Sequence, residues 1–164
     1  MKLSPHLLLA FAICLLALDR NSQAASPGWP QLQGNAERSG NAPHLSLSNS
    51  IGLVKAIPLT DAVFTSPVIG DGKIFAVDGS GVVFAIDQET LSIVWKFATR
   101  GGPGNCNNVA SPALVGSYLH VGTMAGYYYV FDAKTGTVVK EIDCGEPIFS
   151  APAVGNDRVY FATL

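Results

Sequence analysis

The sequence predicts an all-β chain that forms part of a β-propeller built from four-stranded antiparallel blades. Three observations lead to this fold class. A segment with a proline recurs at Pro67, Pro112 and Pro152, so the repeats are 45 and 40 residues long. Short apolar runs, rich in β-branched and aromatic residues, end at Gly and Asp residues typical of hairpins. No segment after residue 24 has the apolar period of a helix. Such a repeat is the pattern of propeller blades.

Each repeat divides into strands in the same order. The first repeat is expected to form strands at residues 63–69, 73–77, 82–87 and 92–98, the second at 109–115, 118–122, 127–132 and 137–142, and the third at 148–154 and 158–163. Residues 51–57 match the fourth strand of a blade, because Lys55 precedes Pro67 by twelve residues, as Lys140 precedes Pro152. Pro58 ends this strand because it has no N–H to donate.

These eleven strands amount to about 2.75 blades, whereas propellers have four to eight. The first and last strands would leave unpaired edges, which a closed ring avoids. We therefore expect the N-terminal part of a larger ring of about eight blades, with the remaining blades supplied by sequence beyond this chain.

The N-terminus has the layout of a secretory signal peptide. Lys2 precedes an apolar run at residues 7–18, and Ser22 and Ala24 are small residues at the −3 and −1 positions of a cleavage site. The run is too short for an ordinary membrane span, and an uncleaved N-terminal anchor is the alternative. We predict a protein exported to the periplasm or secreted, with a signal peptide at 1–24, an extended segment at 25–50 and the partial propeller at 51–164.

Composition and charge restrict the partners. Hydrophobic residues make up 48% of the chain and charged residues 13%, which suits a buried core and excludes a disordered chain. Without the predicted signal peptide, 8 positive and 11 negative side chains remain. The chain has no basic stripe that could follow a phosphate backbone, so we expect no nucleic-acid partner.

The segment from Ala85 to Trp95 resembles the A-x-D-x-x-T-G-K-x-x-W signature of quinoprotein-type (PQQ-like) β-propellers. The matching residues of the two repeats are Ala85, Asp87, Thr90 and Trp95, then Asp132, Thr135 and Gly136. Leu91 stands at the Gly position of the first repeat, and Lys140 at the Trp position of the second. The Gly-Trp-Pro-Gln-Leu-Gln-Gly segment at residues 28–34 also looks like the N-terminal part of many exported members.

These motif residues are predicted to be structural. Asp87 and Asp132 follow a third strand, where an Asp side chain can accept the N–H groups of a turn. Thr90 and Thr135 can cap the same turns, and the resemblance implies that Trp95 docks between neighbouring blades. We also expect His120 to be a hydrogen-bonded structural residue and the tyrosines at 127–129 to pack between blades.

The resemblance allows two classes of function. Quinone-dependent dehydrogenases of this family stack PQQ on a pair of adjacent, disulfide-bonded cysteines and hold Ca²⁺ with Glu, Asn and Asp. This chain has no such pair, and Asn105, Asn107 and Asn108 match no such motif, so we predict no catalytic or metal-binding residue and assign none to a cofactor. We favour a non-catalytic binding or scaffold module for a protein or polymer ligand, similar to the outer-membrane barrel-assembly propeller lipoprotein. The alternative is the N-terminal part of a periplasmic PQQ-dependent alcohol or sugar dehydrogenase, which would need PQQ and Ca²⁺.

Two cysteines remain after the predicted signal peptide, Cys106 and Cys144. They precede Pro112 and Pro152 by six and eight residues, so both lie in loops that lead into the first strands of adjacent blades. Export to an oxidising compartment favours a disulfide, which requires Cα atoms about 4.4–6.8 Å apart. A Cys106–Cys144 bridge is therefore a candidate, with two free thiols as the alternative.

Overall fold

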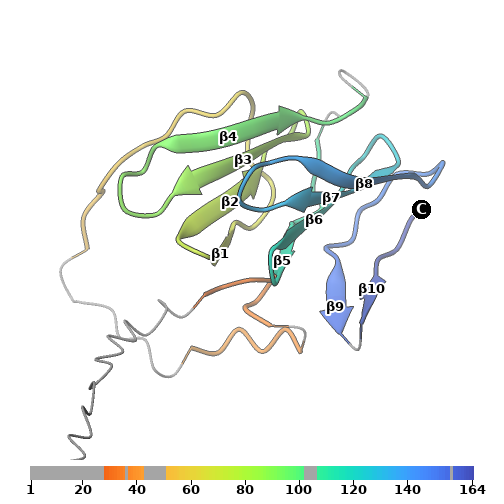
Figure 1. The fold of residues 1–164 in the computed structure, drawn as a ribbon, viewed down its shortest axis with the longest axis horizontal. Coiled ribbons are helices and arrows are strands. Elements are labelled where there is room, and N and C mark those ends of the chain that lie inside the picture. The colour runs from red at the N-terminus through yellow and green to blue at the C-terminus, as the bar shows by residue number, and fades with distance from the viewer. Residues whose placement is uncertain (1–27, 36, 43–50, 102–106, 156) are drawn as a thin grey trace, which may run out of the picture.

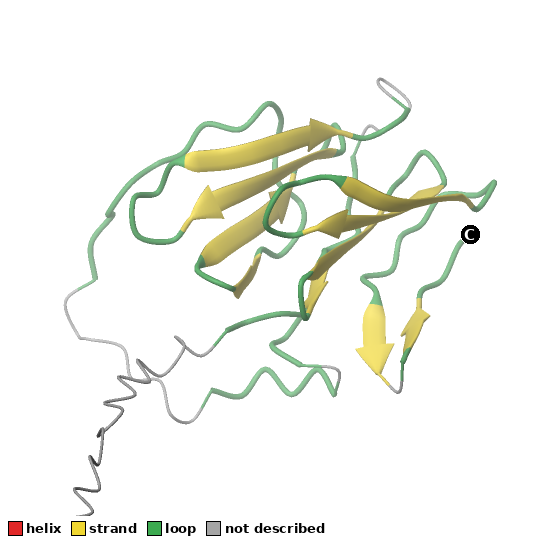
Figure 2. Cartoon of the chain, viewed as in Figure 1, coloured by secondary structure: helices red, strands yellow, loops and turns green. Residues whose placement is uncertain are grey.

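The computed structural model describes residues 28–35, 37–42, 51–101, 107–155 and 157–164, and within these ranges the chain forms strands and loops without a helix (Figures 1 and 2). The first sheet contains β1 (Val68–Gly70), β2 (Lys73–Val77), β3 (Val82–Asp87) and β4 (Ile93–Ala98). The second contains β5 (Ala113–Val115), β6 (Tyr118–Gly122), β7 (Tyr127–Asp132) and β8 (Val138–Asp143). The third is the pair β9 (Ala153–Gly155) and β10 (Arg158–Tyr160).

The two four-stranded sheets are consecutive antiparallel blades with the strands in chain order, which confirms the predicted fold class. We call β1–β4 blade 1, β5–β8 blade 2, and β9 with β10 the third unit. Val68 pairs with Phe75 in blade 1, and Ala113 pairs with His120 at the same positions of blade 2. Both blades shift register at the same place between their third and fourth strands. The two blades therefore share even this β-bulge, at positions 45 residues apart.

The strand predicted at residues 51–57 is wrong. This segment contains no strand, and Ile51, Leu53 and Val54 are 81%, 86% and 88% exposed. A strand satisfies its backbone groups by pairing with a neighbour, and none of the described strands pairs with these residues.

The first strand of each sheet is shorter than predicted. β1, β5 and β9 each begin directly after a proline, at Val68, Ala113 and Ala153, whereas the apolar pattern placed their starts four or five residues earlier. Because proline has no N–H for a ladder, pairing begins only beyond it. The last predicted strand also ends early, at Tyr160.

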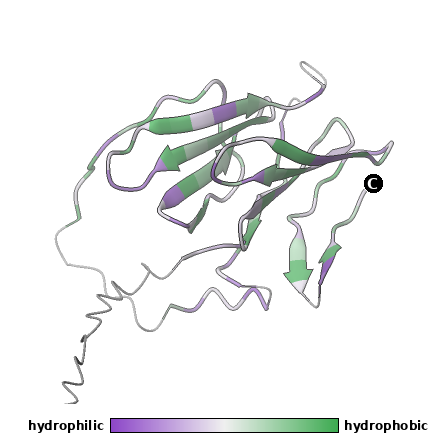
Figure 3. Cartoon of the chain, viewed as in Figure 1, coloured by the Kyte–Doolittle hydropathy of each residue, from purple (hydrophilic) through white to green (hydrophobic). Residues whose placement is uncertain are grey.

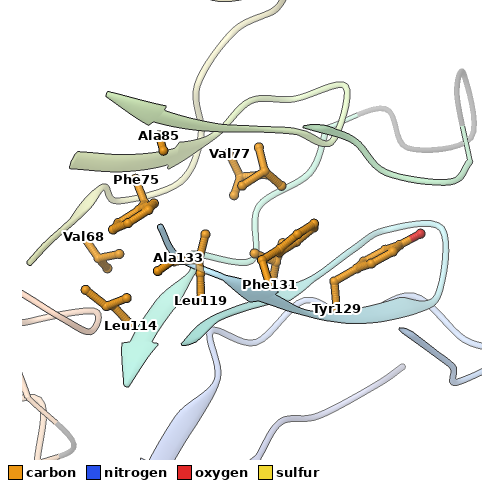
Figure 4. Packing of buried hydrophobic residues seen from close by; sticks show 11 residues of the cluster. Val68, Phe75, Val77, Ala85, Leu114, Leu119, Tyr129, Phe131 and Ala133 are labelled. Atoms are coloured by element: carbon orange, nitrogen blue, oxygen red, sulfur yellow. The ribbon is translucent and has the colours of Figure 1, made fainter. Parts of the chain in front are cut away.

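The main core lies between blade 1 and blade 2 (Figure 4). Alternate residues of a strand face opposite sides of its sheet, so the repeated strands supply one apolar row to each side of this contact. The buried residues are Val68, Phe75, Val77, Val83 and Ala85 from blade 1 and Leu114, Leu119, Val121, Tyr129, Phe131 and Ala133 from blade 2. Figure 3 shows apolar residues along these strands and polar residues at connections such as that between β3 and β4.

The described residues from 28 to 40, which we call the N-terminal strap, contact the first strands of all three sheets (Figure 1). Three successive strap residues bind the residue that lies two positions after each repeat proline. Trp29 exchanges two backbone hydrogen bonds with Ile69 at 2.7 and 2.8 Å, the Pro30 carbonyl accepts one from the Leu114 N–H at 2.7 Å, and Gln31 Oε1 accepts one from the Val154 N–H at 3.4 Å.

Glycines allow this close approach of the strap. A Cβ atom at Gly28 would lie 2.8 Å from the Ile69 carbonyl oxygen, well inside van der Waals contact. Gly34 has a φ of 90°, and a Cβ there would meet the Trp29 ring at 3.2 Å. The two glycines that begin and end the segment at residues 28–34 therefore have steric reasons to be glycine.

Candidate functional site

The aspartates of the repeat motif organise the turns between the third and fourth strands of both blades. Asp87 Oδ1 accepts hydrogen bonds from the Thr90 N–H at 2.7 Å and from the Thr90 hydroxyl at 2.8 Å. In blade 2, Asp132 Oδ1 accepts the same bonds from Thr135 at 2.7 and 2.9 Å. These hydrogen bonds, chiefly from the Thr backbone N–H, lower the pKa of both carboxyl groups. Charged carboxylates used in this way hold turns.

Trp95 in β4 lies across the contact between the two blades. Its indole Nε1 donates to the Ala133 carbonyl at 3.1 Å, and its ring lies 6.0 Å from the rings of Phe75 and Phe131. A Cβ atom at Gly136 would come within 2.6 Å of the indole, so this glycine leaves the space that the ring occupies. In register, Trp95 is paired with the buried Ala85 of β3. Three motif residues, Ala85, Trp95 and Gly136, are thereby brought to one blade contact.

The contact between blade 2 and the third unit is built differently. His120 Nδ1 lies 3.1 Å from the Tyr128 hydroxyl, and the Tyr128 ring stacks on Phe161 with centroids 4.4 Å apart. Burial lowers the pKa of His120, and burial also raises the pKa of Tyr128. The sequence did not predict the stack of Tyr128 on Phe161. The 45-residue repeat does place His120 at the position that Phe75 has in blade 1.

Asp78, in the connection between β2 and β3, was not singled out from the sequence. It is fully buried. Oδ1 accepts from the Ser80 N–H and hydroxyl at 3.1 and 2.9 Å and from the Val82 N–H at 2.9 Å, while Oδ2 accepts from the Thr60 hydroxyl. Burial would raise the pKa of this carboxyl, but the hydrogen bonds from Thr60, Val82 and Ser80 outweigh it and lower the pKa. The Asp-Gly-Ser-Gly segment had indicated only a hairpin turn.

The asparagines considered for ligand binding have structural surroundings where they are described. Asn108 is fully buried; its N–H donates to the Gly79 carbonyl at 3.0 Å, and its Oδ1 accepts from the Met124 N–H at 3.0 Å. Its Nδ2 has no hydrogen-bond partner among the described residues. Asn107 is exposed with a φ of 60°, and Asn105 lies outside the described residues. The amide oxygen of Asn108 is thus already used within the protein.

The described ranges contain no group of three or more His, Cys, Asp and Glu side chains arranged to hold a metal ion. With the Asn108 oxygen occupied and no adjacent cysteines in the sequence, the residues described do not fit the donor set expected for Ca²⁺ and PQQ. We assign no residue to either. The described part of the chain has no helix long and apolar enough to cross a membrane.

The candidate disulfide cannot be placed, because Cys106 lies outside the described residues. Cys144, directly after β8, is half-buried. Burial, with a smaller contribution from Asp143, raises the pKa of its thiol. The Cys106–Cys144 bridge stays a prediction.

Comparison with known proteins identifies the family. Residues 56–123 and 107–164 match the family described as outer membrane protein assembly factor BamB, so the matched ranges cover more than half of the chain. BamB of Legionella pneumophila (strain Paris) is 22% identical over 102 residues, which are 62% of this chain and 26% of that protein. The quinohemoprotein alcohol dehydrogenase ADH-IIG of Pseudomonas putida is 27% identical over 115 residues, which are 63% of this chain and 16% of the enzyme.

Solved structures agree on the fold. The quinohemoprotein alcohol dehydrogenase ADHIIG from Pseudomonas putida HK5 superposes with a TM-score of 0.67 at 22% identity, covering 81% of this chain and 22% of the enzyme. BamB from Moraxella catarrhalis superposes with a TM-score of 0.56 at 23% identity, covering 65% of this chain and 32% of that protein. The chain spans about a quarter of the length of Legionella pneumophila BamB and less than a fifth of the length of Pseudomonas putida ADH-IIG. The resemblance to PQQ-like propellers is confirmed, and the chain belongs to the family of the outer membrane protein assembly factor BamB.

Proposed function

We propose that this chain is part of an exported, non-catalytic β-propeller protein that binds a protein or polymer partner. The family match over residues 56–164 carries the proposal, because the BamB relatives are named as assembly factors. The surroundings of the motif residues support it: Asp87, Asp132 and Trp95 are engaged in turns and in a blade contact.

The alternative is the N-terminal part of a PQQ-dependent alcohol or sugar dehydrogenase. The similarity to ADH-IIG favours it, and such an enzyme would need PQQ and Ca²⁺. The described donor set gives this alternative no residue to hold either group.

Thermal unfolding with PQQ tests whether this part of the protein binds the cofactor of the dehydrogenase alternative. A ligand that binds only the folded state raises the melting temperature in proportion to ln(1 + [L]/Kd). We expect no change in melting temperature when the 164-residue chain is titrated with PQQ in the presence of CaCl₂. A saturable rise that disappears with EDTA would favour the dehydrogenase, and a known PQQ-dependent dehydrogenase serves as the positive control.

Site-specific photo-crosslinking in the producing cell tests for a protein partner. A photoreactive residue at the exposed Asn107, in the loop between the blades, should form a defined protein adduct. The same residue at the exposed Glu89, in the β3–β4 connection, is the matched control. Equal adducts from both positions, or none from either, would speak against a specific partner at the Asn107 end.

Mass spectrometry of the exported protein tests the segments proposed from the sequence. Cleavage after Ala24 would give a chain that begins at Ala25. A Cys106–Cys144 bridge would lower the mass by two hydrogens and protect both thiols from alkylation. An intact Met1 would instead support the N-terminal anchor.

A further inference from the structure

An exposed apolar residue recurs at one position of the repeat. Phe64, Val109 and Phe149 each lie three residues before a repeat proline, and their exposed fractions are 57%, 37% and 42%. Each has a buried neighbour in sequence, namely Thr65 at 7%, Ala110 at 0% and Ile148 at 0%, whereas Val63, beside Phe64, is 46% exposed. Packing within the blades does not explain why the same position stays exposed three times.

These three residues, which we call the apolar rim, lie along one end of adjacent first strands. β1 lies beside β5, and β5 beside β9 (Figure 1). The loops that lead into β1 and β5 are joined where the Ser66 N–H donates to the Ser111 hydroxyl at 2.9 Å. Each rim residue precedes its strand by four positions, so the rim follows the order of the three sheets.

The backbone of the N-terminal strap and its Gln31 side chain bind the first strands beyond the prolines, at Ile69, Leu114 and Val154. Arg38 also donates to the Ala151 carbonyl, directly before Pro152, at 3.1 Å. The rim residues lie before the prolines, in the loops that lead into the same strands. Most contacts of the strap therefore lie on the strand side of the prolines, and the three rim residues stay exposed.

Carboxylates lie close in sequence to two rim residues: Asp61 is three residues before Phe64, and Asp143 and Glu146 are six and three residues before Phe149. Asp61 and Glu146 lie in the loops that lead to β1 and β9, and Asp143 is the last residue of β8. All three are exposed and form no ion pair among the described residues. Each carboxylate accepts a hydrogen bond: Asp61 from Ala62, Asp143 from Gly145 and Glu146 from Thr163. Exposed apolar residues with carboxylates in the adjoining segments are complementary to a segment that combines apolar and basic side chains.

We propose that the apolar rim binds an extended, positively charged polypeptide segment. Its apolar side chains would pack on Phe64, Val109 and Phe149, and its Lys and Arg side chains would lie near these three carboxylates. This inference rests on the proposed function and specifies the chemistry of the partner.

Fluorescence anisotropy with the full chain tests the rim. The probe is a fluorescein-labelled peptide of about 12 residues in which Phe and Val alternate with Lys and Ser. The triple variant Phe64→Ser, Val109→Ser, Phe149→Ser should raise the Kd at least about tenfold. The double variant Val94→Ser, Val139→Ser removes apolar side chains that are 49% and 54% exposed on the outer strands β4 and β8, and it should bind like the wild type.

Charge is tested with a second peptide in which Glu replaces Lys, which should not bind measurably. The variant Asp61→Asn, Asp143→Asn, Glu146→Gln should weaken binding of the Lys peptide and flatten its salt dependence. The variant Phe64→Leu, Phe149→Leu should retain affinity, and thermal melts show whether each variant folds.

Several results would overturn the rim proposal: no binding of the Lys peptide, equal binding by the rim variant and the wild type, or equal binding of the Glu peptide. A rim variant that changes only the self-association of the chain would point to a second copy as the occupant. PQQ binding would overturn the proposed function without altering these peptide affinities, so the two failures are distinguishable.

Discussion

The two contacts between successive sheets use the same repeat positions with side chains of different polarity. Blade 1 presents Phe75, Val83 and Trp95 to blade 2, whereas blade 2 presents His120, Tyr128 and Lys140 at the equivalent positions. The first contact is an apolar cluster with the indole hydrogen bond within it, and a hydrogen bond from the Arg100 N–H to the Tyr129 hydroxyl and an Arg100–Glu141 ion pair at its edge. The second contains a His–Tyr hydrogen bond and a stacked Tyr–Phe pair.

The turns of the two blades, in contrast, are nearly identical. Asp87 and Asp132 accept corresponding hydrogen bonds of closely similar length. The turn sets the path of the chain within a blade, so its chemistry is repeated. The face of a blade has only to match the next face, so its composition varies.

Removal of Trp95 should have the largest effect on this contrast. Trp95→Ala leaves a cavity between the blades and is expected to lower the free energy of unfolding by about 3–4 kcal/mol. Lys140→Ala, at the exposed equivalent position, should change it by less than about 0.5 kcal/mol. Urea denaturation followed by circular dichroism measures both changes. Equal losses of unfolding free energy would show that Trp95 contributes no more to the contact between sheets than Lys140 does.

Exchange of the turn residues is expected to have the next largest effect. Gly136→Leu copies Leu91 but places a side chain at a φ of 74° and 2.6 Å from the indole, which should cost about 2–3 kcal/mol. Leu91→Gly, at a φ of 52°, should be neutral or stabilise by up to about 1 kcal/mol.

A double-mutant cycle with Trp95→Ala provides the control for this exchange. If the clash with the indole causes the loss, part of the cost of Gly136→Leu disappears in the Trp95→Ala background. Full additivity of the two costs would contradict the clash.

The connection between the second and third strands offers a third comparison. Asp78→Ala removes a buried carboxylate that accepts four hydrogen bonds and should cost about 2 kcal/mol. Thr123→Ala, at the equivalent residue of blade 2, loses two bonds with Tyr127 and should cost about 1 kcal/mol. Thermal melts at neutral pH compare them, and a larger loss from Thr123 would contradict the ranking.

Acid should reduce the difference between wild type and Asp78→Asn. The folded pKa of Asp78 lies below its ordinary value of 3.8, so the unfolded chain takes up this proton first as the pH falls. The stabilisation is present above pH 3.8 and is lost as the pH falls through the folded pKa. A difference that stays constant down to pH 2 would show that the charge of Asp78 does not matter.

His120 should give the smallest effect, visible through its pH dependence. Burial holds its pKa below 6.5 in the folded state, so the unfolded chain binds a proton first and stability falls as the pH drops below 6.5. His120→Phe, which copies Phe75, should remove this part of the dependence and, by leaving the Tyr128 hydroxyl without its partner, cost about 1 kcal/mol at neutral pH. Melting temperatures between pH 7.5 and 5.5 test this, and Phe75→Leu should leave the slope unchanged.

Local patterns in the sequence predicted β2, β3 and β4 and their counterparts in blade 2 to within one residue. Hairpin residues such as Gly70–Gly72 and the alternation of side chains act over a few positions, so they can be read without the fold. Residues 51–57 have the same composition, but a strand also needs a partner, which composition does not reveal. The stack of Tyr128 on Phe161 was missed for the same reason, since it joins residues 33 positions apart.

The N-terminal strap has a consequence for the order of folding. Its bonds from Trp29, Pro30 and Gln31 join residues that are 40, 84 and 123 positions apart, whereas the hairpins of each blade close over a few residues. Contacts of long sequence separation form late, because closing the intervening chain costs entropy that only completed structure offsets. The segment synthesised before the blades is therefore the one that docks after them, and its docking reports that three successive sheets have formed in the right order.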